Sequence, residues 1–374
     1  MSPDLVYRKY IPGEEESIVE LLERGFGGWP AFDLRCSSVD HWSWKYVDVP
    51  LGEGFVITAL SGSDVVGALH AYPVRIKVNN QIFFCTYAAD NVVHPDYRER
   101  GISNRMYEEI IDLKNGSDVA FDYFVTSTPY LIKSWSRRFY TFPFTISNLV
   151  WIGDIDLQLR EMPVRHPSLV KLGFLTSKTI NRYRKKKNKS PKDDGVAIEV
   201  AEEFGEWADV LWIDISRDYD FIVERSRRYL NWRYCDKRAG DIVVKQLKRE
   251  DEVLGFSVYG INSQNPEYPV GYILDLIVPS GEESYAGLLI EDSIKYFKER
   301  GINLVNCLMP RGHVYTDILK EHGFLDSRVV LKLFLRLNQE RTYLSDLIVQ
   351  CSPDRVHFTY GDIDSMPSRI PSYV

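Results

Sequence analysis

The sequence predicts an α/β (α+β) protein made of two tandem modules, each with a mixed, mainly antiparallel sheet flanked by helices. Its 374 residues exceed the size at which a single hydrophobic core usually stops growing. Segments that alternate apolar and polar residues, as strands do, are interspersed with amphipathic helical segments in both halves. The same order of segments occurs twice along the chain, so we expect two related modules.

Composition and charge indicate a folded protein. The chain is 44% hydrophobic and 26% charged, which is typical of globular domains. Its net charge of −7 and pI near 5.6 argue against nucleic acid or an anionic membrane as a partner, because those partners select basic surfaces. The first residues lack the pattern of a secretory signal, and no apolar run is long enough to span a bilayer. We expect a cytoplasmic protein with no membrane partner, and the oligomeric state stays open.

Cysteine and histidine spacing give no sign of a metal site. The five cysteines are widely scattered and form no C-x-x-C pair, so we expect reduced thiols. The histidines also lack metal-ligand spacing. We expect no structural or catalytic metal.

The first half reads as a strand and a helix, followed by two hairpins, a second helix and another strand. The second hairpin turns at Asn79-Asn80, residues that tolerate the positive φ of a tight turn. The predicted strands are 6–10, 55–60, 65–72, 74–78, 82–93 and 121–126, and the helices are 14–24 and the stretch up to Leu113.

An internal repeat links the two halves. Trp44-Lys45-Tyr46 precedes Gly67 by the same interval at which Trp232-Arg233-Tyr234 precedes Gly255. Each triplet follows a strand-like segment and precedes a hairpin, an apolar strand that contains Asp and ends at proline, and a helix. Duplication explains this order.

A basic segment lies between the copies. Residues 182–194 combine four consecutive basic residues, 184–187, with Pro and Asp-Asp before Gly195, a pattern typical of an exposed loop. We predict a first module at 1–150, a connecting segment at 151–195 and a second module at 196–374.

The junction at 98–103 is the most informative motif. Arg98-Glu99-Arg100-Gly101-Ile102-Ser103 follows a predicted strand and opens a predicted helix. A glycine turn before a helix presents free N–H groups, and the positive end of the helix dipole lies behind them. Such a turn binds phosphate well, and the two arginines add positive charge.

This junction resembles the cofactor signature of the GNAT superfamily of acyl-CoA N-acyltransferases, Arg/Gln-x-x-Gly-x-Gly/Ala. The preceding Val92-Val93-His94-Pro95-Asp96-Tyr97 matches the usual approach to that signature. Ser103 departs from it, but is a small residue that leaves room for a pyrophosphate. The hairpin at 74–93 and the duplication are similar to tandem-GNAT proteins of the enhanced-intracellular-survival type.

The resemblance implies a cofactor site for acetyl-CoA in the first module. The strand from Asp90 to Val93 would pair with the pantetheine arm, and its N–H would polarise the thioester carbonyl. The helix after Gly101 would take the pyrophosphate. The expected cofactor-binding residues are Val92, Val93, Arg98, Arg100, Gly101, Ile102 and Ser103.

The second copy does not keep the signature. Its corresponding loop, 280–286, carries Glu282 and Glu283 and no arginine. Carboxylates repel a pyrophosphate, so we expect this module to have lost cofactor binding.

Acyl transfer needs a proton acceptor for the amine and a proton donor for the thiolate. Asp90 and His94 are candidate bases, because they lie on the expected active strand and at its end. Tyr130 and Tyr140 follow the next strand, where the family often has its tyrosine acid. Asp122 and Tyr123 on that strand are further candidates, and each of these residues has an ordinary structural explanation as well.

The expected activity is acetyl transfer from acetyl-CoA to a primary amine on a small molecule, an amino sugar or a peptide. Two alternatives stay open. One is an aminoacyl-tRNA-dependent ligase of the cross-bridge-forming class, which the intact loop at 98–103 disfavours because such proteins need no CoA pyrophosphate site. The other is a non-catalytic acyl-CoA sensor or scaffold.

Overall fold

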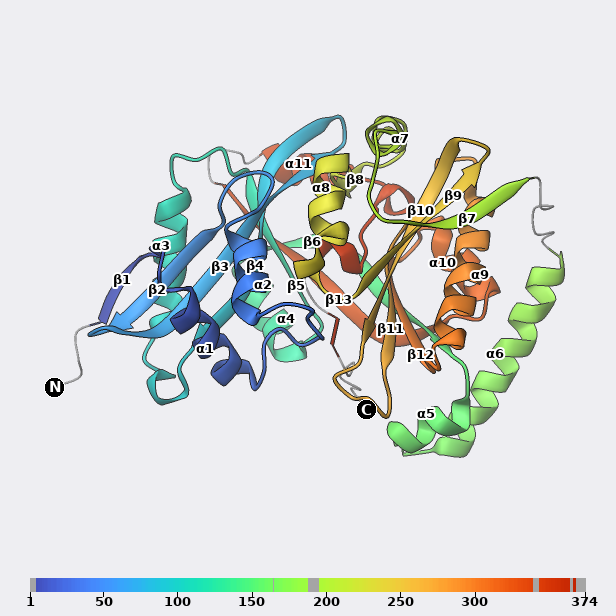
Figure 1. Cartoon of the computed structure of the whole chain (residues 1–374), viewed down its shortest axis with the longest axis horizontal. Helices are drawn as coiled ribbons and strands as arrows, with labels where there is room; N and C mark the ends of the chain where they lie inside the picture. The colour runs from blue at the N-terminus through green and yellow to red at the C-terminus, as the bar shows by residue number, and fades with distance from the viewer. Residues whose placement is uncertain (1–4, 164, 188–194, 339–342, 364–365, 368–374) are drawn as a thin grey trace.

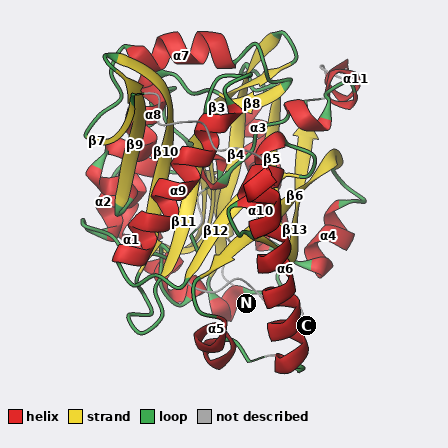
Figure 2. Cartoon of the chain, turned by 90° about the vertical axis from the view of Figure 1, so that its right-hand side faces the viewer, coloured by secondary structure: helices red, strands yellow, loops and turns green. Residues whose placement is uncertain are grey.

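The computed structural model describes residues 5–163, 165–187, 195–338, 343–363 and 366–367. Within these residues the strands form one 13-stranded sheet, and helices lie on both of its faces (Figures 1 and 2). Most neighbouring strands pair antiparallel, and β4–β5 and β11–β12 pair parallel. The predicted fold class, a mixed and mainly antiparallel sheet flanked by helices, is confirmed.

The first half follows the predicted order of elements. Helix α1 buries Ile18, Val19, Leu21 and Leu22 on one face, as its amphipathic pattern predicts. The elements are β1 (Leu5–Lys9), α1 (Glu15–Phe26), α2 (Ser38–Tyr46), β2 (Phe55–Ser61), β3 (Asp64–Val78), β4 (Gln81–Val93), α3 (Ile102–Lys114), β5 (Phe121–Thr126), α4 (Pro129–Trp135) and β6 (Tyr140–Ile152).

Strand β3 corrects one sequence prediction. The two strands predicted at 65–72 and 74–78 are a single strand, and Pro73 lies inside it opposite Thr86 of β4. On its other side, β3 pairs with β2 only as far as Ala71 and with β8 (Phe221–Val223) only from Ile76. Because that side of β3 has no strand partner at Pro73, the missing N–H of proline costs no ladder hydrogen bond.

The connecting segment corrects a second prediction. Two helices, α5 (Ile155–Glu161) and α6 (Pro167–Lys187), follow β6, so the basic residues 184–187 are helical instead of forming a loop. Lys and Arg are good helix formers, and positive charge is favourable at a helix C-terminus. Residues 188–194 of the predicted loop lie outside the described residues.

The second half repeats the order of the first, with one short strand, β8, inserted; α8 and the π-helical turn that continues it (Asn231–Cys235) take the place of α2 before the hairpin. Its elements are β7 (Val196–Ala201), α7 (Trp207–Ile215), β8 (Phe221–Val223), α8 (Arg227–Leu230), β9 (Ile242–Arg249), β10 (Glu252–Asn262), β11 (Val270–Ile277), α9 (Glu283–Glu299), β12 (Leu304–Pro310), α10 (Val314–Glu321), β13 (Leu325–Leu337) and α11 (Tyr343–Val349).

The halves exchange strands. β6 from the first half pairs with β12 from Leu304↔Ile152 to Pro310↔Ile146, and β13 from the second half pairs with β5. β6 and β13 also pair with each other, which joins twelve strands in the order β1-β2-β3-β4-β5-β13-β6-β12-β11-β10-β9-β7. The thirteenth strand, β8, pairs with β3. The module boundaries predicted from the sequence stay a prediction.

The repeated tryptophans meet where the halves face each other. The rings of Trp44 and Trp232 stack with centroids 5.1 Å apart. The indole N–H of Trp44 donates to the carbonyl of Trp232 at 2.9 Å, and that of Trp232 donates to the carbonyl of Trp44 at 3.1 Å. The contact is reciprocal, as expected of equivalent positions in two copies, and both side chains are buried.

We expect Trp44→Ala and Trp232→Ala each to lower the free energy of unfolding by about 3–5 kcal/mol, because each removes a large buried ring. The double substitution should lower the free energy of unfolding by clearly less than the sum of the two single effects. Either change alone already breaks the shared stack and both hydrogen bonds. Urea unfolding measures this coupling. Trp151→Ala, in another hydrophobic cluster, is the control and should add to Trp44→Ala. Additive costs for the Trp44 and Trp232 changes would contradict the coupling.

Candidate functional site

The turn at 98–103 has the geometry that its sequence predicts. Gly101 precedes the first residue of α3, Ile102, with φ of 76°, and Glu99 also has a positive φ of 64°. A left-handed residue at this point favours glycine. The first N–H groups of α3 have no intrahelical acceptor and face the space before the helix. A Cβ on Gly101 would have no heavy atom within 4 Å, so that space is open.

Both arginines of the turn are tied to backbone carbonyls. Arg98 donates from Nε to Val93 at 3.3 Å and from Nη2 to Gly25 at 3.1 Å. Arg100 donates from Nη2 to the carbonyl of Asp96 at 2.8 Å. The two guanidinium groups therefore hold the loop in shape and stay exposed beside it. Their positive charge favours an anion at the turn.

Ser103, Ile102 and the two valines lie around this turn. The Ser103 hydroxyl accepts from Asn91 Nδ2 at 2.7 Å, so it links α3 to the end of β4. Ile102 is buried, and its side chain faces Gly67 of β3. Val92 and Val93 pair with β3 at Ala68 and Gly67. These three apolar residues can therefore offer a ligand mainly their backbone.

Strands β4 and β5 separate next to the turn. They pair only at Thr86↔Asp122 and Tyr87↔Tyr123, although β4 continues to Val93 and β5 to Thr126. The β3–β4 register also shifts between Ala68 and His70, opposite Asp90, which has a positive φ of 37°. A β-bulge of this kind redirects the strand and leaves backbone groups unpaired. The facing edges of β4 and β5 are thus available to a ligand.

A cavity of about 340 Å³ fills the space between β4, β5, α3 and α4. It extends from Asn91 and Ser103 near the turn to Lys114 at the far end of α3. Most of the wall is apolar. The apolar lining residues are Leu69, Ala71, Ala88, Ala89, Ile110, Phe124, Val125, Trp135 and Phe139.

The far end of the cavity is an ion-pair network. Lys114 donates to Asp122 Oδ1 at 2.7 Å and to the Thr86 hydroxyl at 2.9 Å, and Arg336 of β13 donates to Asp122 Oδ2 at 2.6 Å. Burial would raise the pKa of Asp122, but Lys114 and Arg336 lower it below its ordinary value. Asp122 is therefore a structural anion that is already fully engaged, which makes it a poor candidate base.

Tyr107 projects into the same cavity from α3. Its hydroxyl is buried and has no hydrogen-bond partner among the described residues. Burial raises the pKa of Tyr107 to about 12, against the lowering effect of Arg336. A buried hydroxyl without a partner costs free energy, so a ligand that bonds to it gains this contact.

Asp90 lies at the bulge and lines the cavity. Its Oδ2 accepts from Lys45 Nζ at 2.7 Å and from the Tyr46 hydroxyl at 2.5 Å. Burial would raise the pKa of Asp90, but the charge of Lys45 and the hydrogen bonds from Lys45 and Tyr46 lower it to about 2. An anion of such low pKa is a weak base at neutral pH.

His70 holds the bulge from the neighbouring strand. Its Nδ1 meets the Asp90 carbonyl at 2.7 Å, and its Nε2 accepts from the Trp42 indole at 3.1 Å. Because Trp42 can only donate, the proton of neutral His70 belongs on Nδ1. Burial lowers the pKa of His70 to about 4, so the ring stays neutral and fixed.

The other predicted catalytic residues lie outside the cavity lining. His94 accepts from the backbone N–H of Asp96 at 3.3 Å, and its Nε2 lies 2.8 Å from Arg24. Tyr130 is 76% exposed. Tyr140 begins β6, where burial and nearby Cys351 and Asp346 raise its pKa. The structure brings none of these three next to Asp90, and their catalytic roles stay predictions.

A second cavity of about 220 Å³ lies beside the first and shares Tyr87 and Val125 with it. Residues from β4, β5, β6, β13 and the C-terminal segment line it, so both halves contribute. None of these described lining residues is charged. They are Tyr87, Val125, Thr126, Ser127, Asn148, Val329, Leu331, Tyr360, Ile363 and Pro367.

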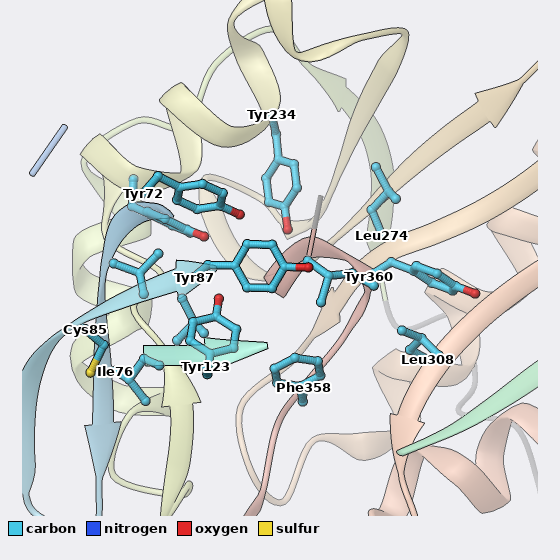
Figure 3. Close-up of a cluster of buried hydrophobic side chains, with 14 of the residues drawn as sticks. Tyr72, Ile76, Cys85, Tyr87, Tyr123, Tyr234, Leu274, Leu308, Phe358 and Tyr360 are labelled. Carbon is cyan, nitrogen blue, oxygen red and sulfur yellow. The ribbon is translucent and has the colours of Figure 1, made fainter. Parts of the chain in front are cut away.

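Figure 3 shows several tyrosines in one buried cluster, and two of them, Tyr87 and Tyr360, line the second cavity. The ring of Tyr87 lies 5.4 Å from that of Tyr72 and 5.0 Å from that of Tyr123. Tyr123 donates to the Asp362 carbonyl at 2.8 Å, and Tyr360 donates to Asn148 Oδ1 at 3.1 Å. The hydroxyls thus connect the first half to the C-terminal segment, and Tyr123 has a structural role here.

The corresponding turn of the second half has N–H groups that are already bonded within the chain. The backbone N–H of Gly281 donates to Glu283 Oε1 at 2.9 Å, and that of Ser280 donates to Asp218 Oδ2 at 3.3 Å. Carboxylates of the chain thus occupy N–H groups that could otherwise bind an anion. The loop therefore both repels a phosphate and satisfies its own donors.

Beyond this turn, Tyr315 of α10 occupies the space at the end of β11. Its hydroxyl accepts from the backbone N–H of Val278 at 2.9 Å and lies 3.2 Å from the Val278 carbonyl. Tyr315 is buried, so it fills the space beside the end of β11, where β11 and β12 no longer pair. The N–H and the carbonyl of Val278 thus have a partner within the chain.

Sequence reasoning missed Tyr107, Lys114 and Tyr87. Ser103, Tyr107, Ile110 and Lys114 follow one another at intervals of four, three and four residues, which puts them on one face of α3. That spacing could have identified the cavity-facing side of the helix. The partners of this face come from distant strands and are not visible in the local sequence.

No metal-binding cluster is found where the structure is described. In those parts of the chain, no three His, Cys, Asp or Glu side chains lie close enough together to hold a metal ion. The five cysteines are all free thiols.

Comparison by sequence finds a family match in the first third of the chain. Residues 6–129 match the family model described as acetyltransferase (GNAT) domain. The match includes the turn, the bulge and both separated strands. The first third of the chain is therefore similar to a GNAT domain. No curated protein matches the sequence.

Solved structures share the fold over most of the chain. A probable N-acyltransferase from Enterococcus faecalis V583 has a TM-score of 0.60 and 12% identity, covering 91% of this chain and 74% of that one. N-myristoyltransferase from Saccharomyces cerevisiae, solved with myristoyl-CoA and inhibitors, has a TM-score of 0.60 and 12% identity, covering 95% and 86%. A GCN5-related N-acetyltransferase from Anabaena variabilis has a TM-score of 0.59 and 12% identity, covering 89% and 73%. These likenesses show a common fold.

We expect Gly101→Glu to abolish acetyl-CoA binding in a folded protein. The new carboxylate would stand in the open space before α3 and repel a pyrophosphate. Titration calorimetry measures the affinity, and circular dichroism checks the fold.

Gly281→Glu is the matched control, because Gly281 also has a positive φ and no heavy atom near its Cβ position. It carries the same backbone strain in the second half and should leave the affinity unchanged. Unaltered affinity in a folded Gly101→Glu protein would remove the turn from the site.

Proposed function

We propose that the chain is an acyl-CoA-dependent N-acyltransferase that transfers acetyl from acetyl-CoA to a primary amine in the cytoplasm. The acceptor is a small molecule, an amino sugar or a peptide. The observation that carries the proposal is the separation of β4 from β5 directly beside the anion-binding turn of α3. A long cavity begins at that turn and follows the separated strands.

In this proposal the pyrophosphate binds the N-terminus of α3, where free N–H groups, Arg98 and Arg100 favour an anion. The pantetheine arm then enters between β4 and β5 and pairs with the edge of β4 that does not face β3, near Val92 and Val93. The thioester reaches the bulge at Asp90. Its carbonyl accepts from an N–H of the bulge, which stabilises the charge that develops during attack.

The amine enters from the second cavity and attacks near Tyr87 and Val125, which line both cavities. The uncharged lining of the second cavity disfavours an ammonium ion, because burial lowers the pKa of an amine. The acceptor therefore arrives largely neutral. The nitrogen attacks the carbonyl carbon, the C–S bond breaks, and the amine proton leaves with the thiolate or through water.

Asp90 serves as a positioning residue in this mechanism. Its carboxylate joins Lys45 and Tyr46 of α2 to the bulge, and its low pKa makes it a weaker base than the sequence prediction assumed. The resemblance to tandem-GNAT proteins of the enhanced-intracellular-survival type fits this arrangement and stays a prediction.

Mass spectrometry of the purified protein for bound CoA, followed by an assay of acetyl-CoA with a panel of amines, tests the proposal. CoA release that depends on an amine supports an acyltransferase. Tight acetyl-CoA binding without release to any amine would favour the non-catalytic sensor. Failure to bind acetyl-CoA at all would contradict the proposal.

We expect Asp90→Asn to lower thermal stability and to weaken acetyl-CoA binding, with a smaller effect on kcat. The change removes the carboxylate that pairs with buried Lys45, and breaking a buried ion pair costs about 3 kcal/mol or more. Since the pKa of Asp90 is depressed, this stabilisation is present above the unfolded pKa of about 3.9 and is lost as pH falls toward 2.

Calorimetry, thermal melting and the pH profile of kcat/KM separate the two roles of Asp90. A positioning residue leaves the acidic limb of the profile in place in the variant. A loss of about 10²–10⁴-fold in kcat with unchanged affinity, together with loss of that limb, would identify Asp90 as the general base instead.

We expect Tyr107→Phe to weaken acetyl-CoA binding several-fold without lowering stability. Its hydroxyl has no partner in the described protein, so its removal breaks no bond in the free enzyme. Tyr259→Phe is the control, because that hydroxyl bonds to the Leu289 carbonyl at 3.0 Å and its loss should cost stability. Unchanged affinity in Tyr107→Phe would exclude contact between this hydroxyl and the ligand.

A further inference from the structure

Helix α6 presents an exposed apolar stripe. It runs along the outer edge of the molecule, where it packs against α10 and α5 (Figures 1 and 2). Leu169, Leu172 and Leu175 are 67%, 63% and 48% exposed. Because they are spaced three residues apart, they follow one side of the helix. Phe174, in contrast, is buried.

The same helix is strongly basic. Residues 167–187 contain seven Lys and Arg and no Asp or Glu, in a chain whose net charge is −7. Lys171 is engaged by Asp156, with both carboxylate oxygens at 2.7 Å from Nζ. The other six basic residues follow in the sequence from Lys178 to Lys187. The apolar stripe and the basic run are therefore consecutive along one helix.

We propose that α6 docks on the surface of an anionic lipid bilayer. Leu169, Leu172 and Leu175 enter the boundary between headgroups and acyl chains, and the positive charge of the helix attracts it to the anionic headgroups. An exposed apolar stripe joined to a basic run is the pattern that binds such surfaces. This revises the expectation drawn from the net charge, because the attraction depends on charge near the surface and falls off within a Debye length.

Two other occupants fit the helix less well. A second copy of the chain would bring two acid-free basic helices together, and like charges repel. A nucleic acid would use the basic residues but would leave the three exposed leucines in water. In the part of the chain that the structure describes, no helix is long and apolar enough to cross a bilayer. Docking is therefore along the surface.

Co-sedimentation of the full chain with vesicles tests the inference. One set contains equal parts of phosphatidylcholine and phosphatidylglycerol, and the other contains phosphatidylcholine alone. We expect binding to the anionic set, little binding to the neutral set, and weaker binding at high salt. The combined variant Leu169→Ser, Leu172→Ser and Leu175→Ser should bind at least about tenfold more weakly.

The matched control is Val210→Ser with Ile213→Ser on α7, which are 62% and 54% exposed. It removes comparable apolar surface elsewhere and should leave vesicle binding unchanged. Both variants should keep the circular dichroism spectrum and the acetyl-CoA affinity of the parent. Since these readouts do not involve vesicles, failure of the docking inference is distinguishable from failure of the proposed activity.

The inference is overturned if the full chain does not bind anionic vesicles, or if the leucine variant binds them as well as the parent. Sedimentation velocity without lipid provides a further check. A dimer that the leucine variant loses would assign α6 to a second copy. If the parent and the leucine variant bind duplex DNA equally and neither binds vesicles, α6 would be assigned to nucleic acid.

Discussion

The exchange of β6 and β13 between the halves is the constraint on which the rest of the structure depends. Each strand pairs with a strand of the other half, and the two also pair with each other, so one hydrogen-bonded ladder runs through the whole sheet. Separating the halves would expose these backbone groups, which must be hydrogen-bonded when buried. The stacked Trp44 and Trp232 add a second, reciprocal contact between the halves. The edge of β5 that does not face β4 is therefore fixed by the second half, and the uncharged cavity is built from both halves.

The two copies diverge at their turns and at the adjacent strand ends. In the first half β4 and β5 separate around a cavity that begins at the turn before α3. In the second half Glu283 takes the N–H of Gly281, and Tyr315 takes the N–H of Val278. A few side chains thus separate an open site from a closed one on the same arrangement of strands. The closed half still supplies β13, whose Arg336 completes the ion pairs of Asp122.

Local patterns in the sequence were sufficient to predict most strands of the first half, helices α1 and α3, and the glycine turn before α3. The glycine before α3, the hairpin at Asn79 and the amphipathic face of α1 each depend on neighbouring residues. The strand exchange depends on pairing between residues more than 150 positions apart, such as Ile152 and Leu304, and no local pattern reports it. The basic end of α6 was predicted as a loop. A run of like charges is compatible with a solvated loop and with a solvated helix, so the local sequence does not distinguish the two. The Asp90 environment required knowledge that Lys45 and Tyr46 of α2 reach the bulge.

The central claim is that one half of a duplicated fold keeps an acyl-CoA site and the other half supports it. Titration of the full chain with acetyl-CoA in a calorimeter tests this most directly. The open turn and separated strands of the first half, and the internally satisfied turn of the second, predict one binding site per chain. Two sites per chain, or no binding, would contradict the account.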